Sequence, residues 1–511
     1  MPFRSILFGD PDANTGAEER STPDYFRDLN IDQIVGAVIK GRDEYKLAPF
    51  FATPLTDVDA VLYRQEVFQD LENEQLHEIV VTFAGRMERM RSLLRASAKL
   101  HYRYEKERWF LNAVAVYSEG VTALASDLTQ ADIESPGFLV LREDVTRYAK
   151  SERFTSLADE VRSLLDGLAA VRYCVLTKGS RITVGHYDGE ADYSQQVVKT
   201  FERFQQGAVK DYRIKLPMLA GMDHVEAGIL NLVAKLYLDL FGALDAFCSE
   251  HRAYLDTGIS RFDRELQFYL SYLDHLTRLR DAGLDFCYPQ ISGQTKETRA
   301  KETFDLALAA KLVGEKSPVV CNDFYLSDAE RIMVVSGPNQ GGKTTLARTF
   351  GQLHYLASLG CPVPGRDVRL FLPDRIFTHF EREEDLSTLA GKLEDELLRI
   401  RAILERATPC SVIILNEIFT STTLRDALFM SEEILGQVSE LDALCLCVTF
   451  IDELSTLNEK TVSMVSTVMP EDPAVRTYKL IRKPADGRAY AQAIAAKYAL
   501  TYDALKGRVT S

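Results

Sequence analysis

A glycine-rich segment from Gly337 to Thr344, with the letters GPNQGGKT, constrains this 511-residue chain more than any other stretch. It fits the pattern G-x-x-x-x-G-K-[ST], in which backbone N–H groups surround phosphates while the lysine reaches the terminal ones. An apolar run, residues 332–335, and Ser336 precede it, and residues 344–359 have the periodicity of a helix whose positive end would face a bound anion. We therefore predict a nucleoside triphosphate site between a strand and a helix. The alternative is a glycine-rich turn with an incidental lysine.

The composition is that of an ordinary globular chain, with 46% hydrophobic and 26% charged residues. Its length exceeds one hydrophobic core and predicts two to four domains, given about 100 to 200 residues per domain. No apolar run is long enough to span a membrane, and residues 1–19 do not resemble a signal peptide, so we expect a cytoplasmic protein. The net charge of −15 confines any nucleic-acid contact to local basic patches.

Eight cysteines are scattered along the chain without a C-x-x-C pair, so we expect neither a disulfide framework nor a metal cluster. Cys445 and Cys447 lie two residues apart in an apparent strand, where side chains at i and i+2 share one face. Small buried hydrophobic residues are the expected role of this pair.

Helical periodicity dominates the first half of the chain. Residues 21–47 read as a first helical piece, and a second helix follows with Thr56 or Asp57 as its cap. Long helices are expected at 74–125 and again at 225–279, and two β-rich runs between residues 171 and 188 predict a hairpin between them. A basic stretch with interleaved aromatic residues, 86–110, could contact phosphates or could be a solvated helix face.

Strands and helices alternate in the last part of the chain, which is typical of an α/β domain. The expected strands are residues 332–336, 368–372, 375–380, 411–415, 443–449, 462–468 and 477–482. Two polar residues, Asn416 and Glu417, directly follow the apolar run 411–415, and ligands bind at such strand ends in open α/β sheets. Nucleotide hydrolysis needs a metal and a group that activates water, so Asn416 could orient a metal-bound water and Glu417 could serve as general base. A solvated strand end is the alternative.

These segments resemble the MutS mismatch-repair family. Residues 337–345 match its phosphate loop, Gly-Pro-Asn-x-Gly-Gly-Lys-Ser/Thr, which is narrower than the general pattern. The resemblance continues through residues 384–386, 394–397, 416–422 and 490–495. Upstream, residues 54–57 and 63–68 are similar to the start of the family's helical core, and the two helical arms look like its lever helices.

The resemblance implies a multidomain fold: an α-helical core and lever region with a small β insertion, then an α/β P-loop NTPase domain of the ABC-like type. We expect a disordered N-terminus at 1–20, the core and first lever arm at 21–170, a clamp-like β insertion at 171–216, returning lever helices at 217–291 and a MutS-type ATPase domain at 292–511. Only about 50 residues precede Pro54, so the mismatch-recognition and connector domains are expected to be lacking.

ATP and Mg²⁺ are the cofactors that the resemblance implies. Lys343 and Glu417 would be catalytic, Thr344 would bind the metal, and Asn416 would hold it through water. Gly391 and Lys392 align with the loop that reaches a partner subunit's nucleotide in the family. The expected nucleotide-binding residues are Gly337, Pro338, Asn339, Gln340, Gly341, Gly342, Lys343, Thr344 and Thr345.

The implied function is a DNA-binding ATPase that closes as a homodimeric clamp through its ATPase domains, in mismatch repair or in related repair or recombination. The family's Thr-His pair is Thr449-Phe450 here and, with Asn416, predicts weak hydrolysis, because phenylalanine cannot polarise water. The alternative is a nucleotide-switched scaffold with weak or no hydrolysis and no DNA binding. An ATPase of the ABC or SMC type is less favoured, since the LSGG-like signature of those proteins is not found.

Overall fold

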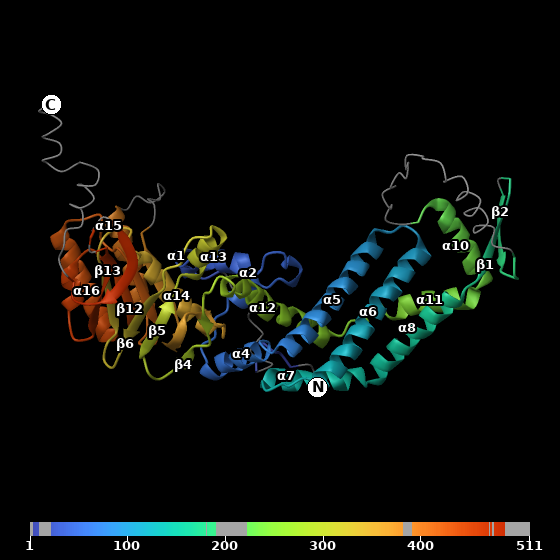
Figure 1. Ribbon diagram of the computed structural model, residues 1–511, viewed down its shortest axis with the longest axis horizontal. Helices are drawn as coiled ribbons and strands as arrows, with labels where there is room; N and C mark the ends of the chain where they lie inside the picture. Colours follow the sequence, from blue (N-terminus) through green and yellow to red (C-terminus); the bar gives the residue numbers. More distant parts are fainter. Residues whose placement is uncertain are drawn as a thin grey trace, which may run out of the picture. The chain divides into compact units, whose positions relative to one another are not determined.

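The chain divides into two units in the computed structural model (Figure 1). The structure describes residues 4–9, 22–179, 181–190, 222–381, 391–469, 471–472 and 475–485. The helical unit comprises residues 1–3, 73–133 and 139–263, and the α/β unit comprises residues 4–72, 134–138 and 264–511. Two helices, α7 (Pro136–Ala149) and α12 (Thr257–Arg280), contribute residues to both units.

Two long helices, α5 (Glu74–Lys99) and α6 (Arg103–Gln130), form an antiparallel pair in the helical unit (Figure 1). The predicted long helical stretch therefore breaks at residues 100–102 and resumes. Asn73 caps the start of α5 by accepting hydrogen bonds from the N–H groups of residues 75 and 76. The helices α8 (Glu152–Ala170), α10 (His224–Leu236) and α11 (Leu238–Glu250) also belong to this unit.

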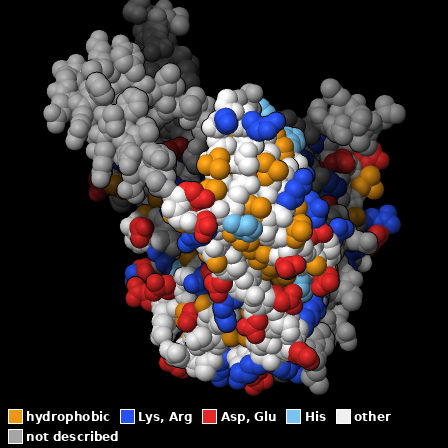
Figure 2. All heavy atoms as spheres, turned by 90° about the vertical axis from the view of Figure 1, so that its right-hand side faces the viewer, with side chains coloured by type: hydrophobic (Ala, Val, Ile, Leu, Met, Phe, Trp, Pro, Cys, Tyr) orange, Lys and Arg blue, Asp and Glu red, His pale blue; other side chains and the backbone are white. Residues whose placement is uncertain are grey.

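The predicted hairpin is present as β1 (Tyr173–Lys178) paired antiparallel with β2 (Arg181–His186). Part of the clamp-like insertion, residues 191–216, lies outside the described residues. Large hydrophobic side chains are exposed at this end of the unit, including Leu176 at 56% and Leu238 at 69%. On the described part of this face, Lys and Arg lie among acidic and hydrophobic side chains, so the surface is mixed rather than continuously basic (Figure 2).

The α/β unit begins with the segment Ser5 to Phe8, which is buried in its core. The main-chain N–H of Ile6 donates to Glu265 on α12 at 2.9 Å, and the hydroxyl of Tyr269 donates to the carbonyl of Ile6 at 2.6 Å. Residues more than half the chain length away therefore hold this N-terminal segment in place.

Four short helices follow this segment. The predicted helix at residues 21–47 is instead broken into α1 (Tyr25–Asp28), α2 (Ile31–Val38) and the 3-10 turn η3 (Asp43–Tyr45). Asn30, between α1 and α2, has a left-handed conformation with φ of 56°, which interrupts the helix. After α3 (Ala48–Phe51), the helix α4 (Val58–Asp70) is capped by Asp57, which accepts from the N–H of Ala60 at 2.9 Å, one of the two predicted caps.

A six-stranded sheet forms the centre of the α/β unit, in the order β10-β11-β12-β7-β13-β14. All neighbours are parallel except β14, which pairs antiparallel with β13. All seven predicted strands are present within two residues of their expected limits, and six of them form this sheet. Its strands are β7 (Ile332–Ser336), β10 (Ile376–Phe380), β11 (Val412–Asn416), β12 (Leu444–Val448), β13 (Thr461–Val468) and β14 (Arg476–Arg482).

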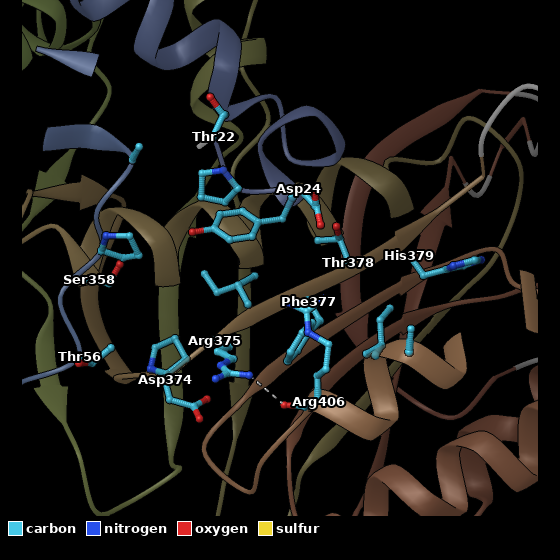
Figure 3. A pocket seen from close by; sticks show the side chains of 18 of the residues that line it. Thr22, Asp24, Thr56, Ser358, Asp374, Arg375, Phe377, Thr378, His379 and Arg406 are labelled. Atoms are coloured by element: carbon cyan, nitrogen blue, oxygen red, sulfur yellow. Dashed lines mark hydrogen bonds between the residues drawn. The ribbon is translucent and has the colours of Figure 1, made fainter. Parts of the chain in front are cut away.

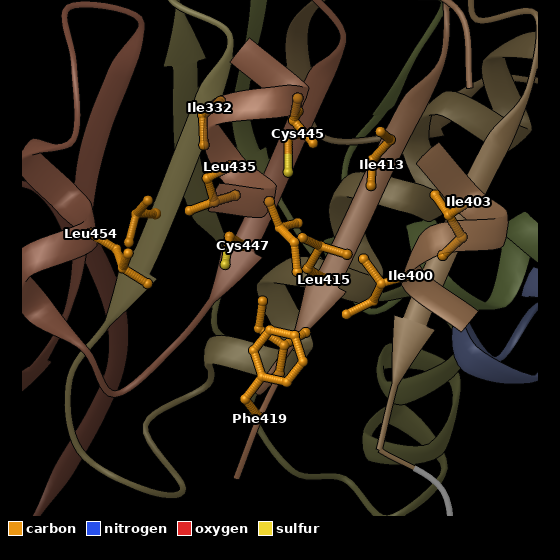
Figure 4. Close-up of a cluster of buried hydrophobic side chains, with 14 of the residues drawn as sticks. Ile332, Ile400, Ile403, Ile413, Leu415, Phe419, Leu435, Cys445, Cys447 and Leu454 are labelled. Carbon is orange, nitrogen blue, oxygen red and sulfur yellow. The ribbon is translucent and has the colours of Figure 1, made fainter. Parts of the chain in front are cut away.

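The predicted helix after the glycine-rich segment is α14 (Lys343–Ser358), and α15 (Lys392–Arg406) and α16 (Leu424–Leu441) also pack in this unit. A buried cluster joins strands β7, β11 and β12 to α15 and α16 (Figure 4). Cys445 and Cys447 are fully buried within it, which confirms their predicted role as small core residues. Apolar packing therefore fixes β7, β12 and β11 beside the glycine-rich segment.

Smaller sheets that the sequence did not predict lie before and after β7 in the chain. One has four strands in the order β4-β9-β5-β6, with β4 (Gln290–Ser292), β5 (Thr298–Thr303), β6 (Asn322–Leu326) and β9 (Arg366–Phe371). The other pairs β3 (Phe286–Cys287) with β8 (Val363–Pro364). Helix α13 (Leu306–Gly314) and the 3-10 turn η4 (Asp452–Thr456) complete the unit.

Among the described residues, no single helix has the length and apolar character to span a membrane; α10 and α11 reach that criterion only together, as a pair bent by 107°.

Candidate nucleotide-phosphate site

The glycine-rich segment forms the loop between β7 and α14, at the edge of the sheet where the parallel strands end. Gly337 has φ of 120°, Gln340 of 58° and Gly342 of 92°, so the loop repeatedly uses left-handed conformations that favour glycine. Gly342 caps the start of α14, and the main-chain N–H groups of its first turn remain available for an anion.

Two neighbouring strands, β13 and β14, support the loop through side-chain hydrogen bonds. Ser466 of β13 is fully buried and donates from its hydroxyl to the carbonyl of Gly341 at 2.6 Å. A Cβ added to Gly341 would lie 2.2 Å from this hydroxyl oxygen and 2.9 Å from the carbonyl oxygen of Pro338. Arg476 of β14 donates to the carbonyl of Asn339 at 3.1 Å. The first glycine of the Gly-Gly pair, Gly341, is therefore required by the close approach of the Ser466 hydroxyl and the Pro338 carbonyl.

Lys343 is 3% exposed and its ammonium group lies against the loop. It donates to the carbonyl oxygens of Gly337 at 2.9 Å and Pro338 at 3.2 Å. The same ammonium lies 4.3 Å from the centre of the Phe450 ring, close enough for a cation–π interaction. Burial lowers the pKa of Lys343, and the charge of Glu417 opposes this shift. Phe450, whose ring cannot polarise water, thus contacts Lys343, which would bind phosphate.

Asn416 and Glu417 stand at the end of β11, one strand away from β7 across β12. Asn416 is 7% exposed, and its side-chain oxygen has no hydrogen-bond partner in the part of the chain that the structure describes. Glu417 adopts φ of 58°, and its main-chain N–H donates to the carbonyl of Val448 at 2.9 Å. Burial raises the pKa of Glu417, whereas the nearby charge of Lys343 lowers it.

A second carboxylate supports the segment after β11. Glu396 of α15 is 1% exposed and accepts a hydrogen bond from the main-chain N–H of Phe419, which has φ of 61°. Burial raises the pKa of Glu396. Because Glu417 and Phe419 both adopt left-handed conformations, this bond holds a strained turn. Glu396 belongs to the segment of family resemblance, but sequence spacing alone does not reveal that it reaches Phe419.

The other predicted site residues lie as follows. Thr344 and Thr345 are half-buried in the first turn of α14. Gly391 is exposed and precedes α15, and Lys392 forms an ion pair with Glu381 at 2.6 Å. The structure therefore gathers Gly337 to Thr345, Asn416 and Glu417 at one edge of the sheet. Residues 384–386 and 490–495, which also carry the family resemblance, lie outside the described residues.

The residues present fit a nucleoside triphosphate with its magnesium ion. The loop leaves no room for a Cβ at Gly341. The ammonium group of Lys343 lies against the loop, where a bound anion could replace its contacts with the carbonyl and the Phe450 ring. The buried and unpartnered oxygen of Asn416 suits a hydrated cation, since hard divalent cations prefer oxygen ligands. Thr344 supplies a hydroxyl at the N-terminus of α14. Loop, helix end and polar pair together can hold phosphate and metal.

Two arginines of the basic stretch in the helical unit form ion pairs with carboxylates of the same unit. Arg91 forms an ion pair with Asp263, and Arg103 forms ion pairs with Glu107 and Asp245. The aromatic rings pack between helices as well: Tyr104 contacts Phe241, and Phe110 contacts Phe247 and Tyr254. These contacts favour the interpretation of this stretch as a packed and solvated helix face.

Fold and site together define the C-terminal part of the chain as an α/β domain with a candidate phosphate-binding loop. Residues 333–501 match the family description MutS domain V. The C-terminal region is thus a MutS-family domain, which confirms the predicted resemblance over this part of the chain.

Curated relatives agree with this assignment. Endonuclease MutS2 of Thermus thermophilus is 34% identical over 193 residues, 37% of this chain and 25% of that protein. DNA mismatch repair protein MutS of Rickettsia bellii is 30% identical over 190 residues, 35% of this chain and 21% of that protein. DNA mismatch repair protein MutS of Thermosipho melanesiensis is 31% identical over 202 residues, 38% of this chain and 24% of that protein. The alignments thus cover about a quarter of these relatives' own length.

Proposed function

We propose that this protein is a MutS-like ATPase of the P-loop type, which binds ATP with Mg²⁺ at the loop from Gly337 to Thr344 and hydrolyses it slowly. One observation supports the proposal: the loop, Lys343 and the pair Asn416–Glu417 lie at one edge of a mostly parallel sheet, within the region that matches MutS domain V. The domain ranges predicted from the sequence, including the clamp-like insertion at 171–216, belong to the same proposal.

Each site residue has a defined task in this proposal. The loop amides and the N-terminus of α14 bind the phosphates, and Lys343 neutralises the terminal ones. Thr344 holds the metal directly and Asn416 holds it through water, with less affinity than a carboxylate would give. Glu417 accepts a proton from the attacking water; burial favours this role because it raises the pKa of that carboxyl toward neutrality.

ATP binding and turnover test the assignment. Lys343→Ala should abolish binding of a fluorescent ATP analogue, because no other described side chain of the loop carries a positive charge. Glu417→Gln should retain binding and lose about a hundredfold in turnover, which is typical for removal of a general base. Glu432→Gln, at an exposed position on α16, is the matched control and should behave as wild type. Equal turnover in wild type and Glu417→Gln would remove Glu417 from the catalytic role.

The relatives' names extend the proposal to DNA. Two of them are DNA mismatch repair proteins and one is an endonuclease, so we propose that this chain acts on DNA in mismatch repair or related repair or recombination, as a homodimeric clamp closed by ATP through its ATPase domains. Gly391 and Lys392, at the exposed start of α15, are candidates for contact with the partner's nucleotide. Binding to homoduplex, mismatched and branched DNA, measured in parallel with and without ATP, would show which structure is preferred.

The alternative is a nucleotide-switched scaffold without efficient hydrolysis or DNA binding. The contact between Phe450 and Lys343 favours it, as do the amide at Asn416 and the carboxylate partners of Arg91 and Arg103. Phosphate contacts weaken steeply with salt, so DNA binding is most readily detected at low ionic strength. Absence of a shift at low salt, with and without ATP and Mg²⁺, would favour the scaffold.

A further inference from the structure

A cavity of about 830 Å³ lies in the α/β unit, away from the glycine-rich loop. Strand β10 forms its floor, α15 borders one side, and the start of α1 with residues 52–56 borders the other. Thr22 and Asp24 lie across the cavity from Asp374, Arg375 and Arg406 (Figure 3). No task in nucleotide binding falls to this cavity, yet its volume is that of a typical ligand site.

Strand β10 is an edge strand of the six-stranded sheet, with β11 as its single neighbour. The N–H of Val412 donates to the carbonyl of Arg375 at 2.9 Å, so Arg375 faces β11. Residues in a paired strand alternate between the two edges, so the main-chain groups of Ile376 and Thr378 face the cavity. Outside the sheet ladder, no described residue forms a hydrogen bond with these main-chain groups. A row of unpaired groups of this kind is a template for another strand.

The two walls of the cavity differ in charge. On the side of α15, where Phe377 packs against Ile403, the lining includes Arg399 and Arg406, with Arg375 at the end of the strand. Arg399 is ion-paired with Asp395. Arg406 contacts the ring of Phe377, and Arg375 contacts the carbonyl of Arg406. Neither Arg375 nor Arg406 has a carboxylate partner among the residues described, and both are exposed.

The opposite wall is neutral or apolar over most of its length. Tyr25, Ala52 and Pro54 lie there beside residues with hydroxyl side chains. Asp24 is the single carboxylate of this wall in the described lining. The other carboxylate of the cavity, Asp374, already accepts hydrogen bonds from Thr408 at 2.7 Å and Ser411 at 2.8 Å. An occupant therefore meets two exposed arginines without carboxylate partners in the described part of the chain on one side, and mostly neutral or apolar surface on the other.

We propose that this cavity is a docking slot for an extended peptide segment of a partner protein, which adds a strand to the outer edge of β10. Side chains alternate between the two faces of a strand. Acidic residues at every second position would face Arg375 and Arg406, and apolar residues between them would face Tyr25, Ala52 and Pro54. The main-chain groups of Ile376 and Thr378 supply the affinity and the two walls supply the specificity, as in other strand-addition sites.

An octapeptide of alternating valine and glutamate, labelled with fluorescein, tests the slot on the full chain. Its fluorescence anisotropy should rise on binding at low salt, and hydrogen exchange at the amides of Ile376 and Thr378 should slow. Arg375→Glu combined with Arg406→Glu should weaken binding at least about tenfold, because two attractions become repulsions. Arg401→Glu, on the same helix but outside the slot, is the matched control and should leave binding unchanged.

Three further probes separate strand addition from other binding. A valine–lysine octapeptide should bind much more weakly, and an octapeptide N-methylated at alternate residues should not slow amide exchange. Inorganic phosphate should compete no better than its ionic strength predicts. The proposal is overturned if the acidic octapeptide does not bind at up to millimolar concentration, if the N-methylated form binds equally well, or if phosphate displaces the peptide specifically, which would identify a small-anion site. Because none of these readouts involves ATP, they are independent of the proposed ATPase activity.

Discussion

Phe450 holds the ammonium group of Lys343 in an arrangement that a bound phosphate must compete with. The ring centre lies 4.3 Å from the ammonium and the ring is 48% exposed, which places the cation–π interaction at about 1 kcal/mol, between its exposed and buried values. Phe450→Leu removes the ring and keeps an apolar side chain. If the contact stabilises mainly the nucleotide-free arrangement, ATP affinity should rise by up to about fivefold.

Equilibrium titration with a fluorescent ATP analogue, at low protein concentration, measures this change. Phe429→Leu is the control, because Phe429 is also an exposed phenylalanine, at 64%, on α16 of the same unit. The reasoning is refuted if Phe450→Leu leaves the affinity unchanged or weakens it while Phe429→Leu behaves as wild type. An unchanged affinity would mean that the ring contacts the lysine equally in both states, and a weakened affinity would mean that the ring stabilises the nucleotide-bound state.

Three other predictions follow from buried groups. Gly351→Ala should destabilise the protein by about 1–3 kcal/mol in urea unfolding, because its Cβ would lie 2.6 Å from Leu29 and 2.7 Å from Ile414, whereas Gly436→Ala, with open space around it on α16, should be neutral or stabilising. Burial lowers the pKa of His354 from 6.5 to about 4, so the folded state resists a proton that the unfolded state accepts; stability should fall by roughly 2 kcal/mol between pH 7.5 and pH 5, and His354→Gln should lose this dependence. Asn416→Asp should lower the Mg²⁺ concentration for half-maximal turnover by roughly tenfold and lower the melting temperature without nucleotide; unchanged Mg²⁺ dependence would place Asn416 outside the metal site.

The strand–loop–helix around Gly337 could be predicted from the sequence because its causes are local. Strand β7 is buried on both faces and therefore reads as an apolar run up to Ser336, and Gly337 and Gly342 mark two of the three left-handed positions of the loop. Asn416 and Glu417 could be placed beside the loop for a related reason, since the ends of parallel strands meet at one edge of the sheet.

The supports of the site arise from sheet order and could not be predicted in this way. Ser466 reaches Gly341 only because β13 returns to pair with β7, and a serine inside a strand carries no signal of that neighbour. Glu396 reaches Phe419 only because α15 packs over β11. The strand β5, with the letters TRAKET, has no apolar alternation to reveal it, and Asn30 breaks a helix that periodicity alone would continue.

Arg64 links the buried N-terminal segment to a part of the α/β unit that is synthesised much later. Arg64 is fully buried; it donates to the carbonyl of Leu7 at 2.8 Å and to that of Leu359 at 3.2 Å, and its guanidinium lies over the rings of Phe8 and Phe268. At about 5–20 residues per second, a ribosome needs roughly a quarter of a minute to a minute to extend the chain from Arg64 to Leu359.

During that interval the apolar side chains of α3 and α4 have no partner surface to pack against. The helical unit, by contrast, is almost continuous in sequence and can fold as soon as residue 263 has emerged. Nascent chains should therefore recruit chaperones through Phe50, Phe51 and Phe68, which end up buried. Residues 264–511 expressed alone should aggregate and be rescued by supplying residues 1–72 in trans, a complementation that the discontinuous α/β unit makes possible.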